Sequence, residues 1–419
     1  MAKYIIEGGN KLKGRVTLSG NKNSILPCLA ASLLTDEEVT LHNVPKIADV
    51  EVFLKILREL GAEVEEGDHL VKVKCAKINK TTLPDEWVNK LRAAILFVGP
   101  LLARFGKAEF PFPGGDIIGR RSIEAHLLGF QDLGFEFQSK DRYYRSSSLH
   151  NKKKVDCIFL SEASVTATEN LLLASSLIPD ETIIKNCACE PHVVDICNML
   201  IEMGVQIEGV GTQTLKIKGT QKLKGVEFTI SADYMEFGTY AVAAALTGGE
   251  IEIEKKGFPD LDPIIYPLSR MGVIFQDTGN TIKVSAETIL PISSLKTNLW
   301  PGFPTDVMSL VIVLATQAKG VSLLHDWMYE SRMFFVDKLI SMGAQITIAD
   351  PHRVLVYGPT KLYGRSLESP DIRAGMALVL AALIAEGKSE INRIEHIERG
   401  YEDIVGKLSS LGAKIERVE

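Results

Sequence analysis

Five cationic side chains stand beside the predicted starts of helices: Lys22, Arg92, Arg332, Arg373 and Arg399. The first turn of a helix carries unpaired N–H groups and the positive end of the helix dipole, and both favour a bound anion. Each of these charges alone is typical of a solvated helix end or a surface ion pair. Their recurrence at comparable places predicts a site for an anionic ligand.

A glycine-rich loop, Pro113–Arg121, combines the carboxyl group of Asp116 with the guanidinium groups of Arg120 and Arg121. Arginine binds phosphate bidentately, and glycine lets the backbone approach a ligand closely. The alternative interpretation is a surface hairpin with ordinary charges. The loop matches neither a P-loop nor a dinucleotide-binding fingerprint.

Seven carboxylates are candidates for a general acid or base, and the sequence does not rank them: Asp49, Asp116, Glu190, Asp233, Asp306, Glu330 and Asp371. Asp306 opens a predicted helix, where the default role of a carboxylate is to cap the N-terminus. His126 and His396 are expected to be partly buried, hydrogen-bonded histidines.

A repeated pattern predicts the elements that position these residues. An apolar helix end, a glycine and a short alternating strand recur about every 70 residues, which is too long for a solenoid repeat and indicates small subdomains. The repeated glycines are Gly61, Gly134, Gly204, Gly272, Gly343 and Gly412. Before Gly61, the apolar residues of 53–60 share one helix face, and a glycine at the next position permits a left-handed helix end.

A second pattern, Gly-x-x-x-Leu-x-Gly, starts at Gly8, Gly219 and Gly358 and supports the same phasing. Each copy precedes a short strand and then a polar cluster where a helix begins. Each repeated unit is therefore predicted to contain helix, strand, helix, strand and strand. The fold class is α/β, with polar side chains gathered at helix N-termini.

The composition fits two compact domains. The chain has 419 residues, of which 46% are hydrophobic and 24% charged, and this length exceeds one ordinary core. Lysine and arginine total 47 against 53 acidic residues, a net charge of −6. A general basic surface for nucleic acid is therefore excluded, and an anionic ligand must be met by local cations.

We expect a cytoplasmic protein. The N-terminus has no apolar signal segment, and the most apolar run, Ala374–Ala385, is shorter than the roughly 20 residues that span a membrane. The six cysteines are expected to be reduced and mostly buried. A metal or redox pair at Cys187 and Cys189 is the alternative, but no second ligand pair lies nearby in the sequence.

Five segments together resemble the UDP-N-acetylglucosamine 1-carboxyvinyltransferases, a family of enolpyruvyl transferases, and the resemblance runs nearly end to end: Ser19–Asn23, Pro113–Arg121, Phe303–Asp306, Glu330–Arg332 and His396–Tyr401. The resemblance implies six small α/β units, three in each of two domains, with the active site between them. It also implies that residues 22–231 form one domain and that residues 1–21 with 232–419 form the other.

The resemblance further implies the substrates, phosphoenolpyruvate and UDP-N-acetylglucosamine, and a role for each site residue. It also implies a reaction that needs no metal and no organic cofactor. Lys22, Arg121 and Arg399 correspond to the clamp on phosphoenolpyruvate, with Arg332 and Arg373 nearby and Arg92 as a further anion contact. Asn23 and Asp306 correspond to sugar ligands, and Asp306 is the candidate base for the attacking 3′-hydroxyl. The remaining residues expected to line the nucleotide-sugar site are Ser122, Ile123, Glu124, Ala125, Ser164, Val165 and Met328.

The sequence departs from the family pattern at several positions. Asp116 stands where the family usually has a cysteine described as the general acid, so we predict that Asp116 donates the proton. Glu162, Cys189, Tyr234 and Leu96 replace residues typical of the nucleotide and sugar contacts. Two alternatives therefore stay open, an enolpyruvyl transferase with a different hydroxyl acceptor and a non-catalytic paralogue that binds the nucleotide sugar. The oligomeric state is not predicted.

Overall fold

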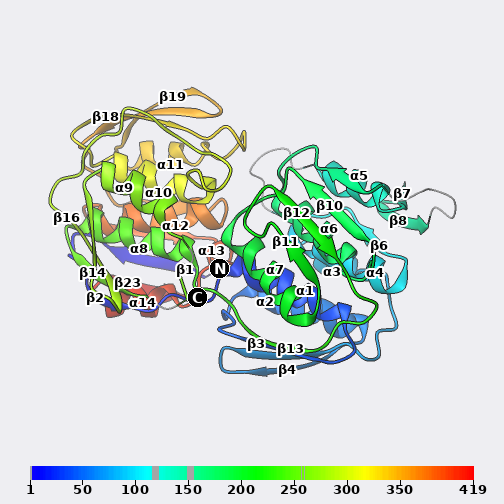
Figure 1. The fold of residues 1–419 in the computed structure, drawn as a ribbon. Coiled ribbons are helices and arrows are strands. Elements are labelled where there is room, and N and C mark those ends of the chain that lie inside the picture. Colours follow the sequence, from blue (N-terminus) through cyan, green and yellow to red (C-terminus); the bar gives the residue numbers. More distant parts are fainter. Residues whose placement is uncertain (1, 116–121, 149–154, 256, 259) are drawn as a thin grey trace. The chain divides into compact units, whose positions relative to one another are not determined.

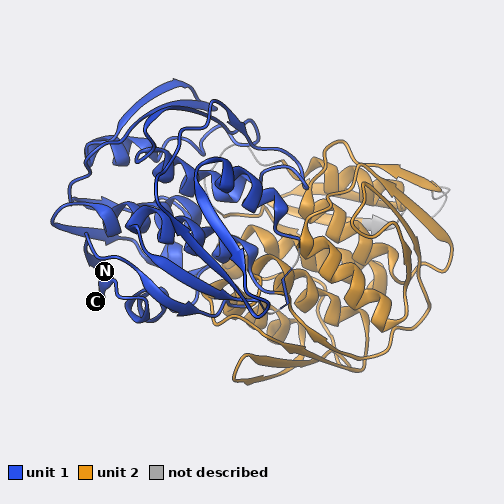
Figure 2. Cartoon of the chain, turned by 60° about the vertical axis from the view of Figure 1, so that its left-hand side comes forward, with its two compact units in different colours: residues 1–19, 117–120, 232–419 blue, residues 20–116, 121–231 orange. Residues whose placement is uncertain are grey.

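The computed structural model describes residues 2–115, 122–148, 155–255, 257–258 and 260–419 (Figure 1). The chain forms two compact units (Figure 2). Unit 1 combines the N-terminal segment up to Ser19 with Ala232–Glu419, and unit 2 contains the described residues between Gly20 and Ser231. Each unit has its own hydrophobic core.

The described residues form six small sheets, three in each unit. The sheets of unit 1, in spatial order, are β21 (Ser366–Glu368), β22 (Lys388–Asn392), β1 (Lys3–Glu7) and β23 (Lys414–Val418); β15 (Val273–Asp277), β16 (Thr281–Ala286), β14 (Glu250–Glu254) and β2 (Lys13–Val16); and β17 (Leu295–Lys296), β18 (Gly320–His325), β20 (Arg353–Gly358) and β19 (Gln345–Asp350). Those of unit 2 are β13 (Val226–Thr229), β3 (Glu38–His42), β5 (Leu70–Lys74) and β4 (Glu63–Gly67); β11 (Gln206–Glu208), β12 (Thr214–Lys218), β10 (Glu181–Lys185) and β9 (Cys157–Phe159); and β6 (Glu109–Pro111), β8 (Tyr143–Ser148) and β7 (Phe135–Lys140).

One pairing scheme recurs in these sheets. In each four-stranded sheet, one edge strand pairs in parallel with its neighbour, and the other pairings are antiparallel. In the three-stranded sheet, a parallel bridge between Thr82 and Glu109 stands where the other sheets have their parallel edge strand. The shared scheme confirms the prediction of an α/β fold built from six similar units.

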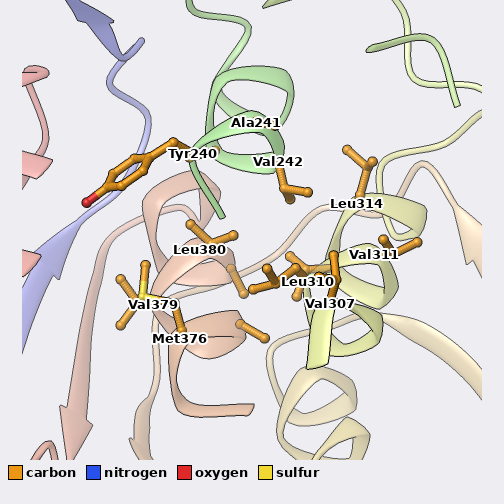
Figure 3. Packing of buried hydrophobic residues seen from close by; sticks show 14 of the residues in the cluster. Tyr240, Ala241, Val242, Val307, Leu310, Val311, Leu314, Met376, Val379 and Leu380 are labelled. Atoms are coloured by element: carbon orange, nitrogen blue, oxygen red, sulfur yellow. The ribbon is translucent and has the colours of Figure 1, made fainter. Parts of the chain in front are cut away.

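Three helices form the centre of each core. They are α8 (Tyr234–Thr247), α10 (Thr305–Ala315) and α12 (Ile372–Ile384) in unit 1, and α1 (Lys22–Ala31), α4 (Val98–Phe105) and α6 (Val165–Ser175) in unit 2. α8, α10 and α12 contact one another, and Figure 3 shows their aliphatic side chains meeting, with Leu310 of α10 near Leu380 of α12. A helix that is apolar on all sides is stable only when it is buried. This burial fixes where the N-termini of the inner helices lie.

The other helices are more amphipathic or short. The outer helices are α9 (Asp262–Arg270), α11 (Val336–Ser341) and α14 (Ile404–Ser410) in unit 1, and α2 (Ala48–Leu60), α5 (Glu124–Asp132) and α7 (Pro191–Met203) in unit 2. The short helices are α3 (Asp85–Val88), α13 (Glu395–Glu398) and the 3₁₀ helices η1 (Ser32–Leu34) and η2 (Arg92–Phe97). None of the helices in the described ranges is both long and apolar enough to cross a membrane.

The repeated glycines follow the outer helices as predicted. All six have positive φ angles, between 88° and 112°. At Gly61, the left-handed backbone lets the Gly61 N–H bond to the carbonyl of Arg58 and the Ala62 N–H bond to that of Leu57. A Cβ atom at Gly61 would lie only 2.8 Å from the carbonyl oxygen of Lys77. Glycine is therefore required here both for the backbone conformation and for the close packing.

Two strands pair with a neighbour that their position in the sequence does not suggest. β2 directly precedes α1, yet it pairs in parallel with β14 of unit 1. β13 directly precedes α8, yet it pairs in parallel with β3 of unit 2. The chain therefore leaves unit 1 after Ser19 and returns to it after Ser231.

Candidate active site

Asp306 lies in the first turn of α10, and both oxygens of its carboxylate are bound by arginines. Arg332 Nη2 lies 2.9 Å from Asp306 Oδ1, and Arg373 Nε lies 3.0 Å from Asp306 Oδ2. The Asp306 side chain is 26% exposed, whereas those of Arg332 and Arg373 are 3% and 7% exposed. The cluster therefore exposes part of its carboxylate to solvent and keeps its cations inside the protein.

Both arginines have hydrogen-bonding capacity in reserve. Arg332 Nε and Arg373 Nη1 are buried and have no hydrogen-bond partner within the described part of the chain. Burial alone lowers the pKa of Arg332, but the carboxylates of Asp306, Asp371 and Asp326 outweigh it and raise that pKa. Burial is likewise outweighed at Arg373, chiefly by Asp306, so its pKa is also raised. Both guanidinium groups therefore stay charged.

The structure corrects the default expectation for Asp306. Pro304 occupies the N-cap position of α10, and no side-chain capping bond is present there. The carboxylate instead accepts hydrogen bonds from the two arginines, and each of these bonds joins opposite charges. Asp306 is thus part of an ion cluster and not a cap.

α12 brings Arg373 to the cluster. Asp371 caps this helix, and its Oδ1 accepts hydrogen bonds from the N–H groups of Arg373 at 2.8 Å and Ala374 at 3.0 Å. The ring of Tyr401 lies against Arg373, with the guanidinium carbon 5.6 Å from the ring centroid. The Tyr401 hydroxyl in turn lies 2.9 Å from Thr239 Oγ1 of α8. Contacts from α8 and from the segment after α13 therefore fix the orientation of Arg373.

Two further predicted residues lie in unit 1. Arg399 occupies the C-cap position of α13 and is half-buried. Met328 is half-buried in the segment between β18 and Arg332, and its N–H donates to Asp326 Oδ1 at 3.0 Å. Asp326 was not among the predicted site residues, because no local pattern distinguishes it.

In unit 2, Lys22 is the first residue of α1 and pairs with Asp49 in the first turn of α2. Lys22 Nζ lies 2.7 Å from Asp49 Oδ2, and the two side chains are 11% and 2% exposed. Asn21 caps α1, and its Oδ1 accepts a hydrogen bond of 2.9 Å from the Asn23 N–H. The side chain of Asn23 is half-buried.

Arg92 begins η2, and its Nη2 donates to the carbonyl oxygen of Ser122 at 2.7 Å. Gly115 lies against the same residue, because a Cβ atom at Gly115 would lie 2.9 Å from Arg92 Cβ. Gly115 also has a φ of 113°, a backbone conformation that favours glycine. Both the close packing and the backbone conformation therefore favour glycine here. Asp116 and Arg121, which carry central predicted roles, lie outside the described residues.

Apart from Met328, the predicted lining of the nucleotide-sugar site falls at two helix starts in unit 2. At α5, Ser122 Oγ accepts a hydrogen bond of 3.0 Å from the Glu124 N–H, while Ile123 and Ala125 are buried. At α6, Ser164 is the N-cap and its Oγ accepts from the Ala167 N–H at 3.3 Å, and the partly buried Val165 begins the helix. Ser122 and Glu124 are exposed at the start of α5.

The histidines have the structural roles that the sequence predicted. His126 is buried, with its ring nitrogens 3.1 Å from Thr166 Oγ1 and 3.1 Å from Asn170 Nδ2. Burial is the main cause that lowers the His126 pKa to about 3, so the ring is neutral at pH 7. His396 Nδ1 lies 2.9 Å from the carbonyl oxygen of Ser369.

The residues that depart from the family pattern occupy different environments. Leu96 is part of the core of unit 2, and Tyr234 is buried with its ring 5.4 Å from that of Trp300. Cys189 is buried and Glu162 is exposed. In the described ranges, no group of three or more His, Cys, Asp or Glu side chains is arranged to hold a metal ion.

Similarity to known proteins identifies the family. The model of the family EPSP synthase (3-phosphoshikimate 1-carboxyvinyltransferase) matches residues 6–408. The chain is 48% identical to the UDP-N-acetylglucosamine 1-carboxyvinyltransferase of Borreliella burgdorferi, with 100% of each chain covered, and 44% identical to that of Treponema denticola, also with 100% of each covered.

Solved structures show the same fold. The enolpyruvyl transferase NikO from Streptomyces tendae superposes with a TM-score of 0.88 at 24% identity, covering 100% of this chain and 99% of that one. An EPSP synthase from Acinetobacter baumannii superposes with a TM-score of 0.75 at 19% identity, covering 100% of each chain. The chain therefore belongs to the EPSP synthase family of enolpyruvyl transferases and, within it, to the UDP-N-acetylglucosamine 1-carboxyvinyltransferases.

Proposed function

We propose that the protein transfers the carboxyvinyl group of phosphoenolpyruvate to the 3′-hydroxyl of UDP-N-acetylglucosamine and releases phosphate. This is the first committed step of peptidoglycan precursor synthesis, and we place it in the cytoplasm. Full-length relatives that carry this name support the proposal. The observation that carries it is the Asp306 cluster, in which a partly exposed carboxylate lies between two buried arginines with unused N–H donors.

We assign the base to Asp306. Its carboxylate is partly exposed and can accept the proton of the sugar hydroxyl. The unused donors of Arg332 and Arg373 are assigned to the carboxylate or phosphate of phosphoenolpyruvate, because charge-assisted bonds hold an anion in one orientation. Arg399 is assigned to the same anion.

Apart from Met328, the other assigned residues belong to the part of the chain between positions 22 and 231. We propose this part as one domain, with residues 1–21 and 232–419 as the second. Lys22 and Arg121 complete the clamp on phosphoenolpyruvate, and Arg92 is a further anion contact. Asn23 and Asp306 contact the sugar. The nucleotide-sugar site is lined by Ser122, Ile123, Glu124, Ala125, Ser164, Val165 and Met328.

The proposed reaction has two stages. A general acid protonates the methylene carbon of phosphoenolpyruvate, and the sugar oxygen attacks the adjacent carbon as its proton passes to Asp306. The resulting tetrahedral ketal then loses a proton from the methyl group and expels phosphate, which restores the double bond. We assign the acid to Asp116, since a desolvated carboxyl group is competent for this proton transfer.

Phosphate release from phosphoenolpyruvate tests the function, measured with and without UDP-N-acetylglucosamine. We expect release only when both substrates are present, and its loss in Asp306→Asn. Asp262→Asn is the matched control, since Asp262 is an exposed carboxylate in the first turn of α9. If the folded protein binds the nucleotide sugar in calorimetry but releases no phosphate, it is a binding-only paralogue. If it does not bind the sugar, the acceptor is a different hydroxyl.

A separate experiment tests Asp116. The native protein should resist epoxides that alkylate an active-site thiol, and Asp116→Cys should become labelled while it keeps transferase activity. Peptide mapping by mass spectrometry identifies the labelled residue. An Asp116→Cys variant that is fully active and still unlabelled would contradict the assignment.

A further inference from the structure

Asp326 is a fully buried carboxylate that the assignments above do not use. It follows β18 directly, and its exposed fraction is 0%. Three groups donate hydrogen bonds to its side chain. Thr305 Oγ1 binds Oδ2, while Thr297 Oγ1 at 3.3 Å and the Met328 N–H at 3.0 Å bind Oδ1. A carboxylate at this depth is stable only because its oxygens are hydrogen-bonded.

The backbone of Asp326 is fixed as well. Its N–H donates to the carbonyl oxygen of His352 at 2.8 Å, and its own carbonyl oxygen lies 2.7 Å from His352 Nδ1. Asp326 therefore has little freedom to move. A rigid acceptor in this place fixes the position of whatever donates to it.

Two of its three donors belong to segments that carry the Asp306 cluster. Thr305 directly precedes Asp306 at the start of α10, where no side-chain cap holds the helix end. Met328 begins the short segment that leads to Arg332. Asp326 is also one of the carboxylates that raise the pKa of Arg332. The third donor, Thr297, follows β17 and is not next to Asp306, Arg332 or Arg373 in the sequence.

We propose that Asp326 is a positioning residue, which sets the start of α10 through Thr305 and the Met328–Arg332 segment through the Met328 N–H. The inference rests on the function proposed above, since it gives Asp326 the task of aligning Asp306 with Arg332 for the transfer reaction. Misplacing a catalytic group by about 1 Å costs on the order of 100-fold in rate. Asp326 thus acts on catalysis through Asp306 and not by contact with a substrate.

The chain offers a matched pair of variants. Thr305→Val and Thr297→Val each remove one hydroxyl from the same carboxylate and conserve the side-chain volume. Only the first acts next to Asp306. Thr305→Ser keeps the hydroxyl and tests rescue, while Asp326→Asn with Thr305→Val completes a double-mutant cycle.

The measurements are kcat and KM for phosphate release, with thermal unfolding as the check on folding. We expect Thr305→Val and Asp326→Asn to lower kcat by about 10- to 100-fold with little change in KM. The double variant should be no slower than the worse single variant. Thr305→Ser should keep kcat within about twofold, and Thr297→Val should keep kcat although it lowers the unfolding temperature.

Equal kcat values for Thr305→Val and Thr297→Val would overturn the inference, as would additive effects in the cycle. Failure of the inference is distinct from failure of the proposed function. If the unaltered protein releases no phosphate with both substrates, the function is wrong. If it does and the two threonine variants behave alike, only the role of Asp326 is wrong.

Discussion

Two inner helices of unit 1 begin with a carboxylate that pairs with a cation, but the two sites differ. At α10, the partly exposed Asp306 is held by buried arginines that retain unused N–H groups. At α8, Glu236 is 2% exposed and pairs with Lys407 at 3.0 Å. Both oxygens of Glu236 are bound by Lys407 Nζ, and Oε2 also accepts the Ser19 N–H at 2.9 Å.

The difference separates a site that we propose binds a ligand from one whose carboxylate is fully paired inside the protein. Lys407 also donates to Ser19 Oγ at 2.6 Å, so the α8 site ties the end of the N-terminal segment of unit 1 to α8 and α14. Burial raises the pKa of Glu236 in spite of Lys407. Ion pairs of both kinds look alike in sequence, and the exposure of the carboxylate together with unused donors distinguishes them.

The largest expected effect is on kcat, from a substitution at Asp306 of α10. Asp306→Asn should lower kcat by about 100- to 10,000-fold, because the side chain can no longer accept a proton. Steady-state phosphate release measures the loss, and circular dichroism checks the fold. A variant with near-normal kcat would remove the basis for distinguishing α10 from α8.

The second prediction concerns the buried ion pair between Glu236 and Lys407 at α8. Glu236→Gln should lower the free energy of unfolding by about 3 kcal/mol, because Lys407 is left without its buried counter-charge. Denaturant unfolding measures this change, and kcat per folded molecule should stay the same. A large fall in kcat with unchanged stability would place Glu236 in the reaction and break the comparison.

Arg373→Lys sharpens the assignment of the unused donors. A lysine can bind Asp306 but cannot present the second, planar set of N–H groups, so KM for phosphoenolpyruvate should rise by about 10- to 100-fold. The same substitution at the exposed Arg15, which pairs with Glu252, is the control and should leave KM unchanged. An unchanged KM in Arg373→Lys would show that its spare donor does not meet the substrate.

The last prediction concerns a buried titratable group in unit 2, His126. His126 has a pKa of 6.5 when unfolded and about 3 when folded, so within this window the unfolded state binds the proton more tightly. The stability from this group is fully present above pH 6.5 and falls by roughly 1.4 kcal/mol per pH unit as the pH drops through the window. Denaturant unfolding from pH 7 to pH 4 should show a shallower loss in His126→Gln. If the free energy of unfolding depended on pH equally in the native protein and in His126→Gln, burial would not lower the pKa of His126.

Much of the fold followed from local patterns. The period of the glycines predicted six units, and the structure confirms their left-handed helix ends and the recurring sheet scheme. Local patterns could not predict that β2 pairs with β14 and β13 with β3. In each pair, the two strands lie more than a hundred residues apart in the chain. Strand pairing depends on which edges meet in space and not on sequence order.

The candidate site was predictable in part. The cations and Asp306 were found from their types at helix starts, and family resemblance supplied their roles, which stay predictions. The capping role expected for Asp306 was wrong, since its partners Arg332 and Arg373 lie 26 and 67 residues away in sequence. Asp326 gave no signal, because its importance comes from the hydroxyl groups that surround it.

The sequence by itself determined the composition of the chain, the period of its repeats, the glycines that end the outer helices and the membership of its family. These properties depend on each residue and its near neighbours. Only the tertiary structure decided which carboxylate meets which cation, which donors remain unused and which charges are sealed. The physical reason is that charge pairing and burial depend on distances of a few ångströms between side chains, and these distances are set by packing of distant segments.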